Sequence, residues 1–292
     1  MKYSMDYEML SAQLSALSDR GVPMEITTLT RSILGKEIPL ISLGKGKKAV
    51  LYVGALNGTA GVTAGVLLDF IADYLKQLER RSTVFEYAMR YLFEQRKIYI
   101  LPMLNPDGVE YALNGVDPQN PIRERVLRMN DGADFSAWQA NARGVDLGHN
   151  FDAGFLTYKQ QTGIADGAPA GYSGEYPESE PETSALCRFL RLRREEIRGI
   201  LALDAPGNEI FCSCGDNLSA KTTSVGRVLA RFTGYRLARP EELCPIGTLS
   251  DWCITKLARP AFTVECGGGA GENRALVYEQ LRRTLFSFPF LV

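Results

Sequence analysis

Short apolar runs recur along the chain and predict strands that are buried on both faces. They lie at residues 49–55, 97–101, 199–203 and 261–264. Residues 25–29 and 38–43 also have the pattern of strands, and apolar residues at helical spacing predict helices over residues 7–17 and 62–78. Because strands and helices alternate from end to end, the pattern predicts an α/β fold with a largely buried sheet.

The organisation of the chain indicates one unit with a long polar insertion. No fixed-period repeat or low-complexity linker divides it, so we predict a single domain over residues 1–292. Residues 105–143 are polar and rich in turn-forming residues, which predicts a long loop of the kind that often carries a site. Ser179 and Glu182 have the spacing of a capping box and predict the start of a helix.

Composition and charge exclude several classes of function. The 292 residues carry 33 Lys and Arg against 34 Asp and Glu, a net charge of −1 without a long block of one sign, so we expect no nucleic-acid partner. We see no apolar run near the length of about 20 residues that a membrane span needs, and the polar N-terminus does not resemble a secretory signal. We therefore expect a cytoplasmic protein without a membrane partner, and the sequence leaves its oligomeric state open.

Five sequence blocks follow one another along nearly the whole chain. They are LYVGALNGTAGVT at residues 51–63, NPDGVE at 105–110, GVDLGHNF at 144–151, YSGEYPESEPET at 172–183 and PAFTVE at 260–265. The ordered set resembles the zinc carboxypeptidase family, and within it the bacterial peptidases that cut γ-D-glutamyl–diaminopimelate bonds in cell-wall peptides. The resemblance implies the carboxypeptidase A-like fold, a mixed sheet with helices on both faces. It also implies a peptidase site at the carboxyl edge of that sheet.

The zinc ligands of the family are missing at the matching positions. The family binds zinc through a His-x-x-Glu pair and a distant His, and these positions fall on Asn57, Ala60 and Asp204. An amide oxygen is a poor zinc ligand, alanine offers no donor, and one carboxylate binds zinc only within a fuller set. The chain has one histidine, His149, whereas catalytic zinc usually takes three protein ligands. We therefore expect no metal cofactor, although the family implies zinc.

Other positions of the family's site are matched only in part. Glu265 falls on the general base, and Asp146 on the carboxylate that orients a ligand histidine, where we expect it to face Asn57. Gly148 and His149 replace the Asn-Arg pair that holds the substrate's terminal carboxylate. His149 is still able to donate to a carboxylate, without the bidentate fork of arginine.

Two further family residues are matched by counting along the chain. Arg128 is matched to the oxyanion-stabilising arginine, and Leu243 stands where the family has a mobile tyrosine. The zinc ligands, the Asn-Arg pair that holds the carboxylate and the tyrosine therefore all differ from the family pattern, which predicts that peptidase activity is lost.

Three hypotheses remain open from the sequence. The favoured one is a metal-free, catalytically inactive relative that binds a peptide or a cell-wall fragment. The second is a metal-free hydrolase that uses Asp204 and Glu265 as an acid–base pair, and the third is a zinc carboxypeptidase with rearranged ligands. Under the first hypothesis Asp146, Asp204 and Glu265 converge without a metal ion. We therefore expect one of them to hold a proton or a cationic group of the ligand to enter.

Overall fold

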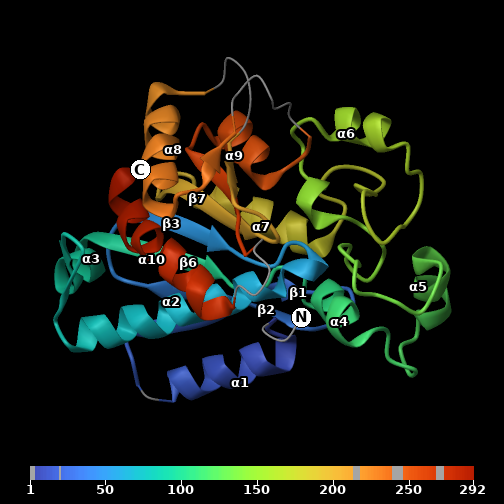
Figure 1. Cartoon of the computed structure of the whole chain (residues 1–292), viewed down its shortest axis with the longest axis horizontal. Coiled ribbons are helices and arrows are strands. Elements are labelled where there is room, and N and C mark those ends of the chain that lie inside the picture. The colour runs from blue at the N-terminus through green and yellow to red at the C-terminus, as the bar shows by residue number, and fades with distance from the viewer. Residues whose placement is uncertain (1–3, 20, 213–217, 239–245, 268–272) are drawn as a thin grey trace.

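A mixed sheet of eight strands forms the centre of the fold (Figure 1). The computed structural model describes residues 4–19, 21–212, 218–238, 246–267 and 273–292. Across the sheet the strands lie in the order β1 (Met24–Arg31), β2 (Glu37–Leu43), β6 (Arg96–Leu101), β3 (Lys48–Val53), β7 (Ile197–Asp204), β10 (Ala261–Glu265), β8 (Glu209–Phe211) and β9 (Arg236–Leu237). The strands β6, β3, β7 and β10 are parallel, whereas β2 pairs antiparallel with β1 and β6, and β8 with β10. A separate small hairpin consists of β4 (Thr83–Val84) and β5 (Tyr87–Ala88).

Helices connect the strands and pack against the sheet. They are α1 (Tyr7–Ser18), α2 (Gly61–Glu79), α3 (Met89–Gln95), α4 (Pro106–Asn114), α5 (Arg123–Asn130), α6 (Phe155–Thr162), α7 (Pro181–Leu192), α8 (Ala220–Thr233), α9 (Leu249–Leu257) and α10 (Arg274–Leu291). Two 3₁₀ turns, η1 (Gly58–Ala60) and η2 (Leu147–His149), lie in the loops near the carboxyl ends of the strands. The helix α10 contacts both α2 and α8, and these three form one layer (Figure 1).

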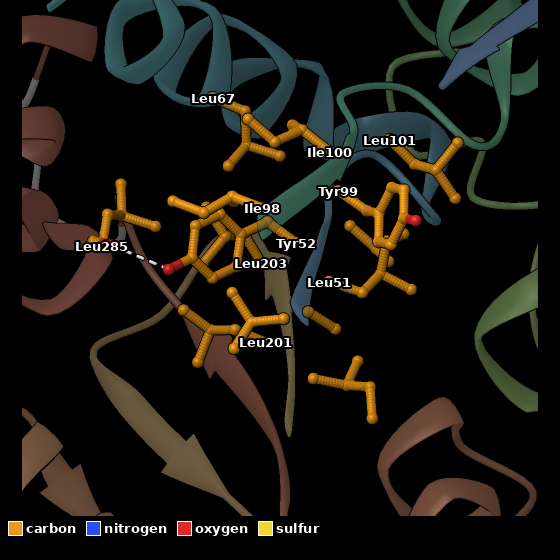
Figure 2. Close-up of a cluster of buried hydrophobic side chains, with 14 of the residues drawn as sticks. Leu51, Tyr52, Leu67, Ile98, Tyr99, Ile100, Leu101, Leu201, Leu203 and Leu285 are labelled. Carbon is orange, nitrogen blue, oxygen red and sulfur yellow. Dashed lines mark hydrogen bonds between the residues drawn. The ribbon is translucent and has the colours of Figure 1, made fainter. Parts of the chain in front are cut away.

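The central strands are covered on both faces. Tyr99 on β6 lies directly opposite Leu51 on β3, so these two side chains point to the same face of the sheet. Tyr52 follows Leu51 in the strand and therefore points to the other face. Tyr52 donates a hydrogen bond to the carbonyl of Leu285 on α10 at 2.7 Å, whereas Tyr99 packs edge-on against Phe189 on α7 with ring centroids 5.1 Å apart. Figure 2 shows both rings within the buried cluster. The predicted α/β fold, with a mixed sheet and helices on both faces, is confirmed.

The helix α2 is apolar because it lies in the core. The segment Gly58–Glu79 is long and apolar enough to cross a membrane by length and composition, so the expectation that no segment approaches this length is wrong. However, 72% of its most apolar window is buried inside the fold, and α2 contacts α1, α3 and α10. This is the burial of a core helix.

The long polar insertion is more regular than the sequence predicts. Residues 105–143 contain the helices α4 and α5 rather than loop alone. Asn105 caps α4 by accepting a hydrogen bond from the amide of Gly108 at 2.9 Å, and Pro106 occupies the first turn. Trp138, which is fully buried, anchors the rest of the segment beside Tyr111 of α4. The turn signals therefore mark helix ends inside the insertion.

The predicted capping box at the start of α7 is not formed. Glu180 is the N-cap residue, and the hydroxyl of Ser179 lies 3.0 Å from both Asn150 Nδ2 and Glu180 Oε1. Glu182 is fully buried, and burial raises the pKa of its carboxyl to about 8. The hydroxyl of Ser179 therefore bonds to Asn150 and Glu180 rather than capping α7, and the buried carboxyl of Glu182 does not cap the helix either.

Candidate functional site

Two carboxyl groups meet at the carboxyl ends of adjacent parallel strands. Asp204 ends β7 and Glu265 ends β10, and the two residues are register partners, so their side chains project to the same face of the sheet. Glu209 of β8 is the antiparallel partner of Glu265 on its other side. Three acidic side chains thus form a row across three strands. Glu209 forms an ion pair with Arg236, but among the described residues no Lys or Arg pairs with Asp204 or Glu265.

A cavity of about 260 Å³ lies against this row. Its lining consists of Leu56, Gly148, His149, Ala202, Leu203, Asp204, Phe211, Cys212, Ile246, Thr248, Leu249, Ser250, Asp251, Thr263 and Glu265. Among these lining residues there is no Lys or Arg, and His149 is the one side chain that can become cationic. The described part of the cavity therefore carries carboxyl and hydroxyl groups on a largely apolar wall.

Both carboxyl groups hold protons more strongly than free side chains do. Burial raises the pKa of Asp204 to about 6; the charge of Asp146 raises it further, while the amide of Ala205 and the ring of His149 oppose the rise. Burial also raises the pKa of Glu265 to about 7, assisted by the charges of Asp204 and Glu209. Both shifts have the direction expected for crowded carboxylates, and the pair becomes fully anionic only above about pH 7.

The ring of His149 is held rigidly at the edge of the cavity. It stacks on Tyr158 of α6 with ring centroids 3.8 Å apart, and its Nδ1 lies 2.8 Å from the carbonyl oxygen of Ile246. Because a carbonyl oxygen only accepts hydrogen bonds, Nδ1 carries a proton, and Nε2 is the acceptor in the neutral ring. His149 thus presents an acceptor when neutral and a donor when protonated.

Asp146 supports the loop rather than Asn57. Its carboxylate accepts hydrogen bonds from the amides of Gly148 at 3.1 Å and Gly171 at 3.2 Å. One oxygen of Asp146 caps the turn η2 through Gly148 and the other accepts from Gly171, and neither of these hydrogen bonds involves Asn57, which Asp146 was expected to face. It still acts on the site through space, since its charge raises the pKa of Asp204.

The residues at the first two zinc-ligand positions, Asn57 and Ala60, are part of the turn η1 and its cap. Asn57 Oδ1 accepts hydrogen bonds from the amide and the hydroxyl of Thr59, at 3.1 and 3.0 Å, and so caps η1. Ala60 is fully buried and offers no donor atom. Among the described residues no group of three or more His, Cys, Asp or Glu side chains is placed to hold a metal ion. The residues that match the zinc ligands therefore do not fit zinc.

The structure does not bring Arg128 to this cavity. Arg128 lies on α5, is largely exposed, and lines a different cavity beside Pro118 and Glu124. Matching by residue position along the predicted loop assigned Arg128 to an oxyanion site. The insertion contains two helices instead of a plain loop, and Arg128 does not line the cavity that contains Glu265. Leu243, matched to the family's tyrosine, lies outside the described residues.

Several lining residues were not predicted from the sequence. The hydroxyl of Ser250 lies 3.0 Å from that of Thr248 and 3.3 Å from that of Thr263. Thr248 and Asp251 form a capping box that begins α9 and fixes this wall of the cavity. The capping-box spacing was readable in the sequence, whereas the position of Glu209 beside Glu265 required the pairing of β8.

Comparison with known proteins agrees with this fold. The family model for zinc carboxypeptidases matches residues 14–233, and the chain belongs to the zinc carboxypeptidase family. A gamma-D-glutamyl-L-diamino acid endopeptidase 1 from Lysinibacillus sphaericus is 28% identical over 90% of this chain. The chain spans 66% of the length of that relative.

Solved structures share the fold at low sequence identity. A carboxypeptidase A from Helicoverpa armigera superimposes with a TM-score of 0.73 at 17% identity, covering 98% of this chain and 72% of that one. The murein-tripeptide amidase MpaA from Escherichia coli O157 gives a TM-score of 0.55 at 19% identity, covering 90% and 91%. These structures share the fold, and the family model over residues 14–233 confirms the predicted family resemblance.

Proposed function

We propose that this protein is a metal-free, catalytically inactive member of its family that binds a peptide or a cell-wall fragment through a cationic group of the ligand. The observation that carries the proposal is the carboxyl pair of Asp204 and Glu265. The pair lines the cavity and lacks a Lys or Arg counterion among the described residues. A ligand amine that enters the cavity would offset charge that the protein itself leaves unpaired.

The chemistry of the first ligand positions supports the loss of metal. Asn57 and Ala60 contribute to a capped and buried turn, so two of the three expected zinc donors are replaced by groups that do not bind zinc. Without a zinc-bound water, Glu265 would act on a water whose pKa is about 15.7 rather than about 7. Retention of Glu265 therefore supports ligand binding better than hydrolysis.

The names of the relatives support the class of ligand. The Lysinibacillus sphaericus relative is named for cleavage next to a diamino acid, and MpaA is named for action on a murein tripeptide. A diamino acid carries the side-chain amine that the carboxyl pair would accept. We therefore propose a peptide bearing a diamino acid or another basic side chain as the ligand.

Amine-bearing ligands are expected to bind, and carboxylate ligands of the same length are not. We expect 1,5-diaminopentane to bind in calorimetry at pH 8 and glutarate to show no binding, because the cavity presents Asp204 and Glu265 without a basic residue. A charged hydrogen bond contributes about 1.5–3 kcal/mol, so Asp204→Asn should weaken amine binding about tenfold or more.

Glu79→Gln is the matched control, because Glu79 is exposed at the end of α2, outside the cavity lining. Its affinity for diaminopentane should equal that of the wild type. Preference for glutarate, or amine binding that is indifferent to Asp204→Asn, would contradict the proposal.

The affinity for amines is expected to rise between about pH 5 and pH 8. The pKa of Asp204 is raised to about 6 and that of Glu265 to about 7, so both carboxyls change from neutral to anionic across this window. Anionic carboxyls attract the ammonium group, and neutral ones do not. Calorimetry of diaminopentane binding in matched buffers measures affinity against pH. A Glu265→Gln variant should lose the rise in affinity near pH 7, because it lacks the carboxyl with the higher pKa. A flat profile in the wild type would show that these carboxyls do not bind the ligand.

A further inference from the structure

A second cavity, remote from the carboxyl pair, gathers arginine side chains. It has a volume of about 480 Å³ and is lined by residues 118 and 120–125 and by Arg128. Arg123, Arg125 and Arg128 face it from α5, and Glu124 is its one acidic lining residue. In Figure 1, α5 stands at the outer edge of the molecule, on the polar insertion. The cavity therefore has an excess of positive charge.

The guanidinium groups of this cavity are weakly engaged. Arg128 approaches Glu124 at 3.9 Å and Arg125 approaches Asp166 at 3.8 Å, and all four side chains are at least half exposed. Exposed ion pairs of this kind contribute about 0–1 kcal/mol. The Nε of Arg123 is buried and has no hydrogen-bond partner among the described residues. A buried donor without an acceptor is costly, so the guanidinium of Arg123, which lines the cavity, is not fully satisfied by the described residues.

The start of α5 adds further donors. Its N-cap residue, Ile122, makes no side-chain capping hydrogen bond, and the amide of Arg123 donates to the carbonyl of Asn120 at 3.0 Å. In the described part of the chain, the amides of Glu124 and Arg125 have no recorded acceptor. Free amides at a helix N-terminus favour anions. The backbone at the start of α5 and the arginine side chains of the cavity therefore both favour a negatively charged ligand.

We propose that this arginine cavity binds an oxyanion, a phosphate or a carboxylate carried by a larger molecule. Arg123, Arg125 and Arg128, which line the cavity from the same helix, would donate guanidinium N–H groups to the oxyanion. Guanidinium groups bind both oxyanions through paired N–H donors. The volume exceeds what a single oxyanion needs, which leaves room for the rest of the ligand.

Calorimetry of the whole protein with inorganic phosphate and with citrate tests the proposal. At least one probe should bind, and Arg123→Gln should weaken that binding about tenfold or more, because a charged hydrogen bond is lost. Glu124→Gln should strengthen it about two- to fivefold by removing a competing negative charge. Binding of phosphate alone would assign a phosphate ligand, and binding of citrate alone a carboxylate ligand.

Arg90→Gln is the matched control, because Arg90 is exposed on α3 and does not line this cavity. Its affinity for the probe should equal that of the wild type. The proposal is overturned if neither probe binds, or if Arg90→Gln weakens binding as much as Arg123→Gln does. Asp204→Asn should leave probe binding unchanged, which separates this site from the carboxyl cavity.

Discussion

The triple variant Asn57→His, Ala60→Glu and Asp204→His is expected to bind zinc stoichiometrically, whereas the wild type is not. The three substitutions restore the ligand types of the family at the matching positions, next to the carboxyl ends of β3 and β7. Asp146 is fixed near the third ligand position, because two backbone amides hold its carboxylate and its charge raises the pKa of Asp204. Elemental analysis after dialysis against a weak chelator measures the zinc content of both proteins.

The energies favour metal binding in the variant. Loss of the Asn57 cap costs about 1 kcal/mol, and insertion of a larger side chain at the fully buried Ala60 costs about 1–3 kcal/mol. Zinc binding to a complete ligand set contributes about 10–16 kcal/mol, which exceeds both costs together.

The single variant Asn57→His is the control for adventitious zinc and should not retain it. Circular dichroism establishes that each variant is folded. A folded triple variant without zinc would contradict the assignment of these three positions. Near-equimolar zinc in the wild type would instead support a zinc site with rearranged ligands.

The wild type is expected to hydrolyse neither C-terminal amino acids nor γ-D-glutamyl–diaminopimelate bonds at a measurable rate. A zinc-bound water has a pKa near about 7, whereas free water has a pKa of about 15.7, and the wild-type donor set does not fit zinc. The assay measures by chromatography how much amino acid or diaminopimelate is released over a day, which detects slow hydrolysis.

Two comparisons identify the origin of any turnover. Turnover that a chelator abolishes would support the zinc hypothesis. Turnover that survives chelator but disappears in Glu265→Gln would support a metal-free hydrolase, in which Asp204 and Glu265 form the acid–base pair. The pKa values of Asp204 and Glu265 are raised to about 6 and about 7, so either carboxyl could exchange a proton near neutral pH. Glu265→Gln removes one of these two groups and therefore tests the acid–base pair directly.

The strands and the family could be predicted from the sequence, because both depend on local or ordered patterns. The runs 49–55, 97–101, 199–203 and 261–264 coincide with β3, β6, β7 and β10 within a few residues, since strands buried on both faces are continuously apolar. The five ordered blocks were sufficient for the family. Local patterns did not predict the helices within residues 105–143, where the turn residues Asn105 and Pro106 mark the start of α4 rather than a loop.

The composition of the site depended on contacts between distant segments. Glu209 lies beside Glu265 because β8 joins the sheet next to β10, and no local pattern specifies which strands are neighbours. Arg128 lies in a separate cavity because α4 and α5 shape the insertion. A count of residues along a segment of unknown path is therefore a weak guide to position.

The sequence by itself determined the class of fold, the family and the chemical identity of the altered ligand positions, because these are properties of residue type and order. The tertiary structure decided how those residues are used. It pairs Asp204 with Glu265 and buries them enough to raise their pKa values. It also turns Asn57 into a cap and occupies Asp146 with backbone amides. Burial and hydrogen-bond partners arise from segments far apart in the chain, and they set the charge that a residue of known type presents to a ligand.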